Sequence, residues 1–196
     1  MTGAPITDVD SLLGVLESGA GATDAEDVDL LAHGLQCAAL LAGVAPDDED
    51  LQIAGLVHDV GTVLWPGRPS THAGAGAAAV ADLLGERVAW LVGHHDEAKR
   101  YLVTTDPDYR SRLSAASVAT LEVQGGRLDD AERARLDAAP WLADVLTMRR
   151  ADDDAKVPGR DVPPLSHWRP IVEATAGRTP TRLSRARPGG TRSPLV

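Results

Sequence analysis

The sequence predicts an all-α protein, and two observations support that prediction. Ala, Leu and Arg are abundant among the 196 residues, while the alternation of β-branched residues that marks strands is almost absent. Apolar residues recur instead at helical spacing, between short segments that stop one helix and cap the next. We expect one globular domain over residues 1–177, followed by a short tail over residues 178–196.

Breaker segments place the boundaries of the expected helices. The segments "SGAGATDAED", "GVAPDDED", "WPGRPS", "TTDPDYR" and "QGGRLDD" each join Gly or Pro to acidic or hydroxyl residues, which end helices and cap new ones. Ser70 or Thr71 is the expected cap before the fourth helix. "KVPGRDVPPL" is expected to end the regular core. The helices are expected at 8–18, 27–42, 49–64, 72–84, 86–102, 114–123, 129–138 and 141–155.

Composition and charge narrow the function. A net charge of −10 argues against nucleic acid or an anionic membrane as the partner of the folded body. No apolar run is long enough to cross a bilayer, and the first residues lack the layout of a signal peptide. The single cysteine, Cys37, excludes an internal disulfide and suits a reducing cytoplasm. The tail has five arginines and no acid, and is expected to be disordered and solubilising, although a contact with the acidic body stays open.

Three expected helices turn ionisable side chains toward the core. Taken alone, a core histidine is usually just hydrogen-bonded, and an Asp–Arg pair is often a surface salt bridge. Together with the adjacent His58 and Asp59, however, so many inward polar groups are hard to satisfy without a metal ion. The stripes at steps of three and four are Leu30, His33, Cys37 and Leu40; Leu91, His95, Lys99 and Leu102; and Leu142, Val145, Arg149, Asp152 and Lys156.

The six histidines of the chain can be sorted by position. His167 lies beyond the last expected helix, and His94 faces a different direction from its neighbour His95. Six candidate nitrogen and oxygen ligands remain, which is more than a single ion needs if some of its coordination positions stay open for chemistry. We therefore expect two metal ions, with Asp59 able to bridge them. No thiolate is involved, which favours catalytic iron, manganese or zinc over structural zinc. The candidate ligands are His33, His58, Asp59, His72, His95 and Asp152.

Cationic residues lie about one helical turn from the candidate ligands. Lys99 comes after His95, while Arg149 precedes Asp152 and Lys156 follows it. Cations beside a positive metal cluster imply a strongly anionic substrate, such as a phosphate, phosphonate or carboxylate. It stays open whether Arg149 and Lys156 merely neutralise the acidic run at 152–154.

Beyond these spacings, several stretches resemble a known family. The order of the histidines, the "HD" pair and the last aspartate is that of the HD-domain superfamily, which includes many metal-dependent phosphohydrolases. The stretches "HGLQCAALLAG", "AGLVHDVG", "THAGAGA", "HDEAKRYLVTTDPDYRSRLSAASVATLEVQGG" and "MRRADDDAKVPG", within residues 26–165, resemble its smaller oxygenase branch of phosphonate dioxygenases and myo-inositol oxygenase. The bare pair is a weak signal, and the fourth and fifth stretches are far more specific.

The resemblance implies a helical bundle with a dinuclear metal site in its core. It implies a mixed-valent Fe(II)/Fe(III) pair on the six candidate ligands, with Asp59 bridging, and O2 as co-substrate. The implied reaction cleaves the C–P bond of a 1-hydroxyphosphonate similar to 2-amino-1-hydroxyethylphosphonate, giving a carboxylate and phosphate. Lys99 and Arg149 match positions that hold the phosphonate. Further matches to substrate-side positions are Glu26, Ser117, Thr120 and Lys156.

Two positions depart from the pattern of the resemblance. Thr23 stands where relatives commonly have a tyrosine, and Thr62 stands where they commonly have a pocket histidine. A phosphonate with a different group at C2, or with none, is therefore an open possibility. An HD-type phosphohydrolase acting on a small phosphate ester also stays open, as does an inactive module that binds an anion. The sequence does not predict the oligomeric state.

Overall fold

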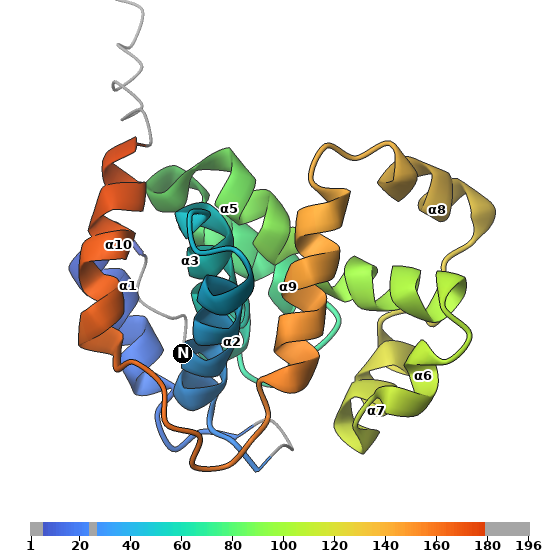
Figure 1. Cartoon of the computed structure of the whole chain (residues 1–196), viewed down its shortest axis with the longest axis horizontal. Helices are drawn as coiled ribbons and strands as arrows, with labels where there is room; N and C mark the ends of the chain where they lie inside the picture. Colours follow the sequence, from blue (N-terminus) through green and yellow to red (C-terminus); the bar gives the residue numbers. More distant parts are fainter. Residues whose placement is uncertain (1–5, 24–26, 179–196) are drawn as a thin grey trace, which may run out of the picture.

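The computed structural model describes residues 6–23 and 27–178, and within them all regular structure is helical, as the sequence predicts. The helices form a bundle with the termini of the described chain on one side (Figure 1). In chain order they are α1 (Val9–Ser18), α2 (Leu30–Val44), α3 (Glu49–Val57), α4 (Val60–Leu64), α5 (His72–Thr105), α6 (Tyr109–Arg112), α7 (Ala115–Val123), α8 (Asp130–Asp137), α9 (Leu142–Asp154) and α10 (Leu165–Arg178).

Two clusters of buried apolar side chains hold the bundle together. The larger cluster contains side chains from the first five helices, α1 through α5, and from α9 and α10. Within it, α5 packs against α3, α4, α9 and α10. The smaller one lies where the end of α5 meets α6 and α7, and consists of Leu102, Val103, Tyr109 and Leu121. In Figure 1 the elements α6, α7 and α8 accordingly form a separate lobe beside α9.

Several helices begin with a side-chain cap near the expected boundary. The side chains of Asp29, Asp48, Ser114 and Asp129 each accept a hydrogen bond from the backbone N–H three residues later, which satisfies one of the unpaired donors of the first turn. Thr71 occupies the cap position of α5, but its side chain makes no capping hydrogen bond.

Three differences separate the observed helices from the expected ones. The helix expected at 49–64 is two helices, α3 and α4, and the break falls at the His58–Asp59 pair. A single helical turn, α6, forms at the end of "TTDPDYR", where no helix is expected. The helices expected at 72–84 and 86–102, in contrast, are confirmed as the two parts of α5, which are separated at Gly85, whose φ of 87° is not helical and is open to glycine. The regular core does not end at "KVPGRDVPPL", because α10 follows it and buries Trp168 and Val172.

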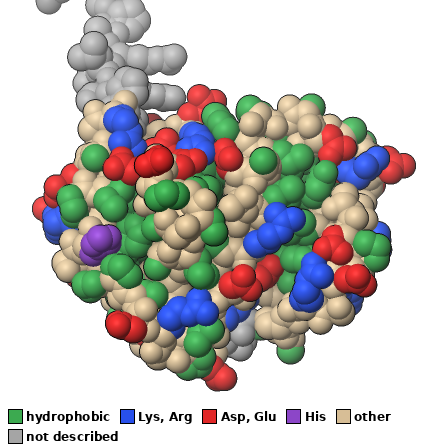
Figure 2. Space-filling view, viewed as in Figure 1, with side chains coloured by type: hydrophobic (Ala, Val, Ile, Leu, Met, Phe, Trp, Pro, Cys, Tyr) green, Lys and Arg blue, Asp and Glu red, His purple; other side chains and the backbone are tan. Residues whose placement is uncertain are grey.

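Arg178 is the first residue of the expected tail. Arg178 is the last residue of α10 and pairs with Glu49 and Asp50 at the start of α3. The rest of the expected tail, residues 179–196, lies outside the described residues. Acidic and basic side chains are interspersed on the face shown in Figure 2, with apolar side chains scattered between them. Among the described helices, none combines the length and apolarity that crossing a membrane requires.

Candidate metal centre and anion pocket

All six candidate ligands converge in the centre of the bundle, as two groups of three. They come from α2, the break between α3 and α4, α5 and α9, so the site assembles only when these elements are packed. One group is His33, His58 and Asp152, and the other is Asp59, His72 and His95; within each, the ligand atoms lie within 4.8 Å of one another.

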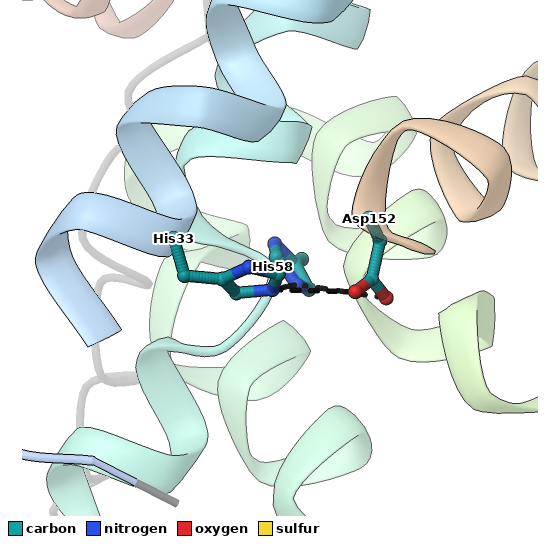
Figure 3. Close-up of side chains that lie close together, drawn as sticks. All are labelled: His33, His58 and Asp152. Atoms are coloured by element: carbon teal, nitrogen blue, oxygen red, sulfur yellow. Dashed lines mark hydrogen bonds and ion pairs between the residues drawn. The ribbon is translucent and has the colours of Figure 1, made fainter. Parts of the chain in front are cut away.

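The first group brings two imidazoles and a carboxylate together, with their ligand atoms close to one another (Figure 3). His33 Nε2 lies 3.1 Å from His58 Nε2 and 3.2 Å from Asp152 Oδ1. His58 Nε2 lies 3.7 Å from Asp152 Oδ2. All three side chains are buried, so water cannot satisfy them freely. A cation between these atoms would receive three ligands at the spacing that first-row metals require.

The second group shares its carboxylate with the first. Asp59 Oδ1 lies 3.3 Å from His72 Nε2 and 3.7 Å from His95 Nε2, which are 3.0 Å from each other. The other oxygen, Asp59 Oδ2, lies 3.4 Å from His58 Nε2 in the first group. Each oxygen of Asp59 therefore faces a different group, which is the arrangement that a carboxylate bridging two ions needs.

Backbone carbonyls fix the orientation of all four imidazoles. The Nδ1 atoms of His33, His58, His72 and His95 lie 2.7 to 3.0 Å from the carbonyl oxygens of Ala155, Gly55, Pro69 and Val92. A carbonyl only accepts, so each Nδ1 carries the proton and donates it. Each Nε2 then points into the group, and once it has no proton it offers a lone pair to a metal ion.

Local backbone structure brings Asp59 to the start of α5. Asp59 follows the end of α3 and precedes α4, whose Gly61 lies against the first turn of α5. A Cβ on Gly61 would come within 2.0 Å of the carbonyl oxygen of His72. Glycine at this position therefore permits the close approach that places Asp59 beside His72.

The electrostatics of the groups favour bound cations. Burial opposes the charged form of His33, but the carboxylates of Asp152 and Asp59 outweigh it and raise the pKa of His33 to about 9. The pKa of His72 is likewise raised to about 9, mainly by Asp59 against the effect of burial. Burial lowers the pKa of His95 to about 4, so this imidazole is neutral at pH 7. The two carboxylates thus attract positive charge strongly, and a metal ion binding here displaces protons.

A cavity of about 320 Å³ opens beside both groups, and cations line its other wall. Lys99 on α5 is buried and donates to Thr120 Oγ1 on α7 at 2.9 Å. Lys156, just beyond α9, donates to Ser117 Oγ on α7 at 2.9 Å. Buried Arg149 on α9 binds Asp152 Oδ2 at 2.6 Å through Nη1. Burial lowers the pKa of Lys99 to about 8, with the charge of Arg149 acting in the same direction.

The remaining predicted residues divide into three cases. Thr62 lines the cavity. Thr23 is exposed, and it is not among the described residues that line the cavity. Glu26 lies outside the described residues. Of the histidines that the sequence analysis set aside, His94 stacks on Trp90 and His167 is exposed on α10; neither belongs to the two groups.

The sequence analysis missed several residues of the cavity lining, among them Asp96, Gln124 and Arg68. Asp96 lies 3.6 Å from His72 Nδ1 and accepts a hydrogen bond from Gln124 at 2.6 Å. Both residues line the cavity. Asp96 directly follows His95 and precedes Lys99 by three residues, so the position next to a candidate ligand was the available signal. Gln124 comes after the short α7 helix and carried no comparable signal.

Comparison with known proteins agrees with this geometry. The sequence matches the HD domain family over residues 30–152. It is 35% identical over 158 residues to hydroxymethylphosphonate dioxygenase of Gimesia maris, covering 76% of this chain and 78% of the relative. It is 30% identical over 156 residues to 1-hydroxy-2-(trimethylamino)ethylphosphonate dioxygenase (glycine-betaine-forming) of Leisingera caerulea, covering 76% and 79%. An uncharacterised protein of Acanthamoeba polyphaga mimivirus is 25% identical over 177 residues, covering 85% and 81%.

The helical fold and the converging His and Asp side chains are those of an HD-domain metal-binding protein. The chain belongs to the HD-domain family and, within it, to the group that contains the phosphonate dioxygenases.

Proposed function

We propose that this protein is a metal-dependent dioxygenase that uses O2 to cleave the C–P bond of a small 1-hydroxyphosphonate. One observation carries the proposal: two groups of metal-ligating atoms and three cationic side chains, Lys99, Arg149 and Lys156, border a single cavity. Such a reaction requires a redox-active metal and side chains that bind the anionic phosphonate. The two relatives named as hydroxyphosphonate dioxygenases support this assignment.

The metal centre proposed here is a pair of iron ions in mixed Fe(II)/Fe(III) valence. The six ligands would be those of the two groups, with Asp59 between the ions. An all-imidazole and carboxylate donor set suits redox-active iron and leaves positions open for substrate and O2. When bound, the pair supplies the activation of O2 and the polarisation of the substrate hydroxyl. The four imidazoles that would hold it, together with the two carboxylates, are already oriented by backbone carbonyls.

The cationic wall would hold the phosphonate. A phosphonate carries up to two negative charges on three oxygens, and a buried ammonium and guanidinium neutralise such a group far better than water-exposed ones. Lys99 and Arg149 would bind the phosphonate oxygens, and Thr120, Ser117 and Lys156 would complete the contact. Fixing the phosphonate in this way places C1 beside the metal centre, where positioning alone lowers the barrier.

The balanced reaction requires no further reductant. For hydroxymethylphosphonate, one O2 is consumed, the C–P bond breaks, and one new oxygen is bound to carbon and one to phosphorus. The products are formate, phosphate and one proton. All four electrons that O2 accepts come from the substrate, whose carbon is oxidised to the carboxylate level.

We further propose that the substrate either carries a small group at C2 or, like hydroxymethylphosphonate, has no C2. Thr62, Val28 and Leu30 line the cavity, and its described lining contains no Phe, Tyr or Trp. A quaternary ammonium group is usually recognised by an aromatic cage, which the described lining does not supply. Hydroxymethylphosphonate, the substrate in the name of one relative, fits this lining better than the trimethylamino compound in the name of the other.

The experiment that tests the proposal measures phosphate release by the iron-loaded protein from a panel of substrates in air. We expect release from hydroxymethylphosphonate and slower release from 1-hydroxyphosphonates as the C2 group grows. Small phosphate esters belong in the same panel, because an HD-type phosphohydrolase would use its metals to attack them with hydroxide. Release from the esters but from no phosphonate would contradict the proposal and leave the hydrolase.

A further inference from the structure

Arg149 is held by three acceptors that come from two different parts of the chain. Its Nη1 binds Asp152 Oδ2 at 2.6 Å, and its Nη2 binds Asp153 Oδ1. Its Nε donates to the phenol oxygen of Tyr109 at 3.2 Å, and that phenol donates in turn to Asp153 Oδ2. Arg149, Asp153 and Tyr109 therefore form a closed ring of hydrogen bonds, in which each side chain contacts the other two.

The ring fixes the direction of the guanidinium. A guanidinium has five N–H donors in one plane, and the three contacts occupy one on each nitrogen. Two N–H donors remain outside these contacts among the described residues, one on each Nη. Arg149 is 3% exposed and borders the cavity, so the plane of the guanidinium decides where these two donors point.

The position of the phenol oxygen is itself set by packing. Tyr109 is 4% exposed, and its ring belongs to the smaller apolar cluster with Leu102, Val103 and Leu121. The guanidinium of Arg112 covers the ring at 5.7 Å from its centre. Burial raises the pKa of Tyr109, so the phenol keeps its proton and remains a donor to Asp153. The ring of Tyr109 would stay in place if its hydroxyl were removed.

We propose that Tyr109 and Asp153 are positioning residues for anion binding, which orient the guanidinium of Arg149 so that its two remaining N–H groups face the bound anion. The single turn of α6 then has a function, because it delivers Tyr109 from the smaller lobe to α9. The inference rests on the proposed function for the identity of the anion. The affinity of the site for an anion can be measured without turnover.

The sequence contains two tyrosines, and the test compares them. Tyr109→Phe removes one hydroxyl and keeps the packed ring. Tyr101→Phe is the matched control, because Tyr101 also donates to an aspartate, Asp137, at 2.7 Å, but belongs to neither the metal groups nor the cavity lining. The metal-loaded, full-length variants would be titrated with inorganic phosphate, and KM and kcat for hydroxymethylphosphonate would be measured in parallel.

We expect Tyr109→Phe to weaken phosphate binding and raise KM about tenfold, which corresponds to ~1.4 kcal/mol, with kcat and metal content close to wild type. Tyr101→Phe should change neither constant. A double-mutant cycle tests whether Tyr109 acts through Arg149: in an Arg149→Lys background, which lacks Nε, Tyr109→Phe should have little further effect. Asp153→Asn, which cannot accept from both partners, should weaken phosphate binding to a similar extent and serves as the second variant if Tyr109→Phe does not fold.

The outcomes separate the inference from the proposed function. Phosphate binding that is equal in Tyr109→Phe and Tyr101→Phe would overturn the inference, even if the wild type is an active dioxygenase. An undiminished effect of Tyr109→Phe in the Arg149→Lys background would overturn it as well, since the phenol would then act elsewhere. Phosphate binding that depends on Tyr109 in a protein without O2-dependent turnover would contradict the proposed function and support the inference.

Discussion

The two walls of the cavity are built in different ways. In the metal wall, each of the four imidazoles is fixed by a backbone carbonyl, and the elements that carry them pack in the larger apolar cluster. In the cationic wall, Lys99 and Lys156 donate to the hydroxyl groups of Thr120 and Ser117, on the short helix α7 of the smaller lobe. In the proposed function, the bundle would hold the metal ions and carry the cationic side chains, whereas the smaller lobe would supply the hydroxyl groups that position the two lysines for the anion.

Neighbouring histidines on α5 give the largest expected difference. His95→Ala should remove a ligand from the second group and lower both metal content and activity, the latter by more than about 100-fold, because even the loss of an outer partner of a ligand costs 10–100-fold. His94→Ala should retain metal and most activity, since His94 stacks on Trp90 and bonds its carbonyl. Metal analysis of the two purified variants, with turnover measured alongside, would check this. Equal metal loss in both would show that the second group has been misassigned.

A substitution in the cationic wall should change binding and spare the metal. Lys99→Met keeps the length of the side chain and removes its charge, so KM for the phosphonate should rise about 100-fold, because a buried charge-assisted contact is lost. Metal content should match the wild type. Steady-state kinetics on metal-quantified protein measure this directly, and a fall in metal content as large as that of His95→Ala would contradict the separation of the two walls.

The same lysine predicts a pH dependence of binding. Its pKa is lowered to about 8, chiefly by burial, so Lys99 is charged below pH 8 and loses its charge as the pH rises above it. KM should therefore be level from pH 7 to 8 and then increase by about tenfold per pH unit. In Lys99→Arg the charge persists, and the alkaline rise should disappear even if the absolute KM is higher. A rise of equal steepness in Lys99→Arg would assign the titration to another group.

The smallest expected effect is on substrate choice. Thr62→Ala enlarges the cavity by about the volume of a hydroxyl and a methyl group. The ratio of kcat/KM for a C2-substituted 1-hydroxyphosphonate to that for hydroxymethylphosphonate should increase by about tenfold, the usual scale for such a change in a pocket wall. Competition between the two substrates gives this ratio directly. An unchanged ratio would place the C2 end of the substrate away from Thr62.

Helical spacing and family resemblance were sufficient to predict the all-α fold and the six residues that converge. Other features depend on contacts between distant segments. The two carboxylate oxygens of Asp59 face different ligand groups because the chain breaks between α3 and α4. The sequence pattern predicted one continuous helix there. Helix α10 was missed because the Pro-rich segment "KVPGRDVPPL" predicted the end of the regular core, yet the helix forms beyond it, contains Pro170 and buries Trp168. The contact of Tyr109 with Arg149 joins residues 40 apart and depends on how α6 packs, which no local pattern reports.

The most direct test of the central claim is the stoichiometry of O2 and phosphate. Iron-loaded protein would be given hydroxymethylphosphonate in a closed oxygen-electrode cell, with phosphate assayed at intervals and an anaerobic sample run in parallel. The account predicts one O2 consumed for each phosphate released and no phosphate without O2. Phosphate released at the same rate under anaerobic conditions would contradict it.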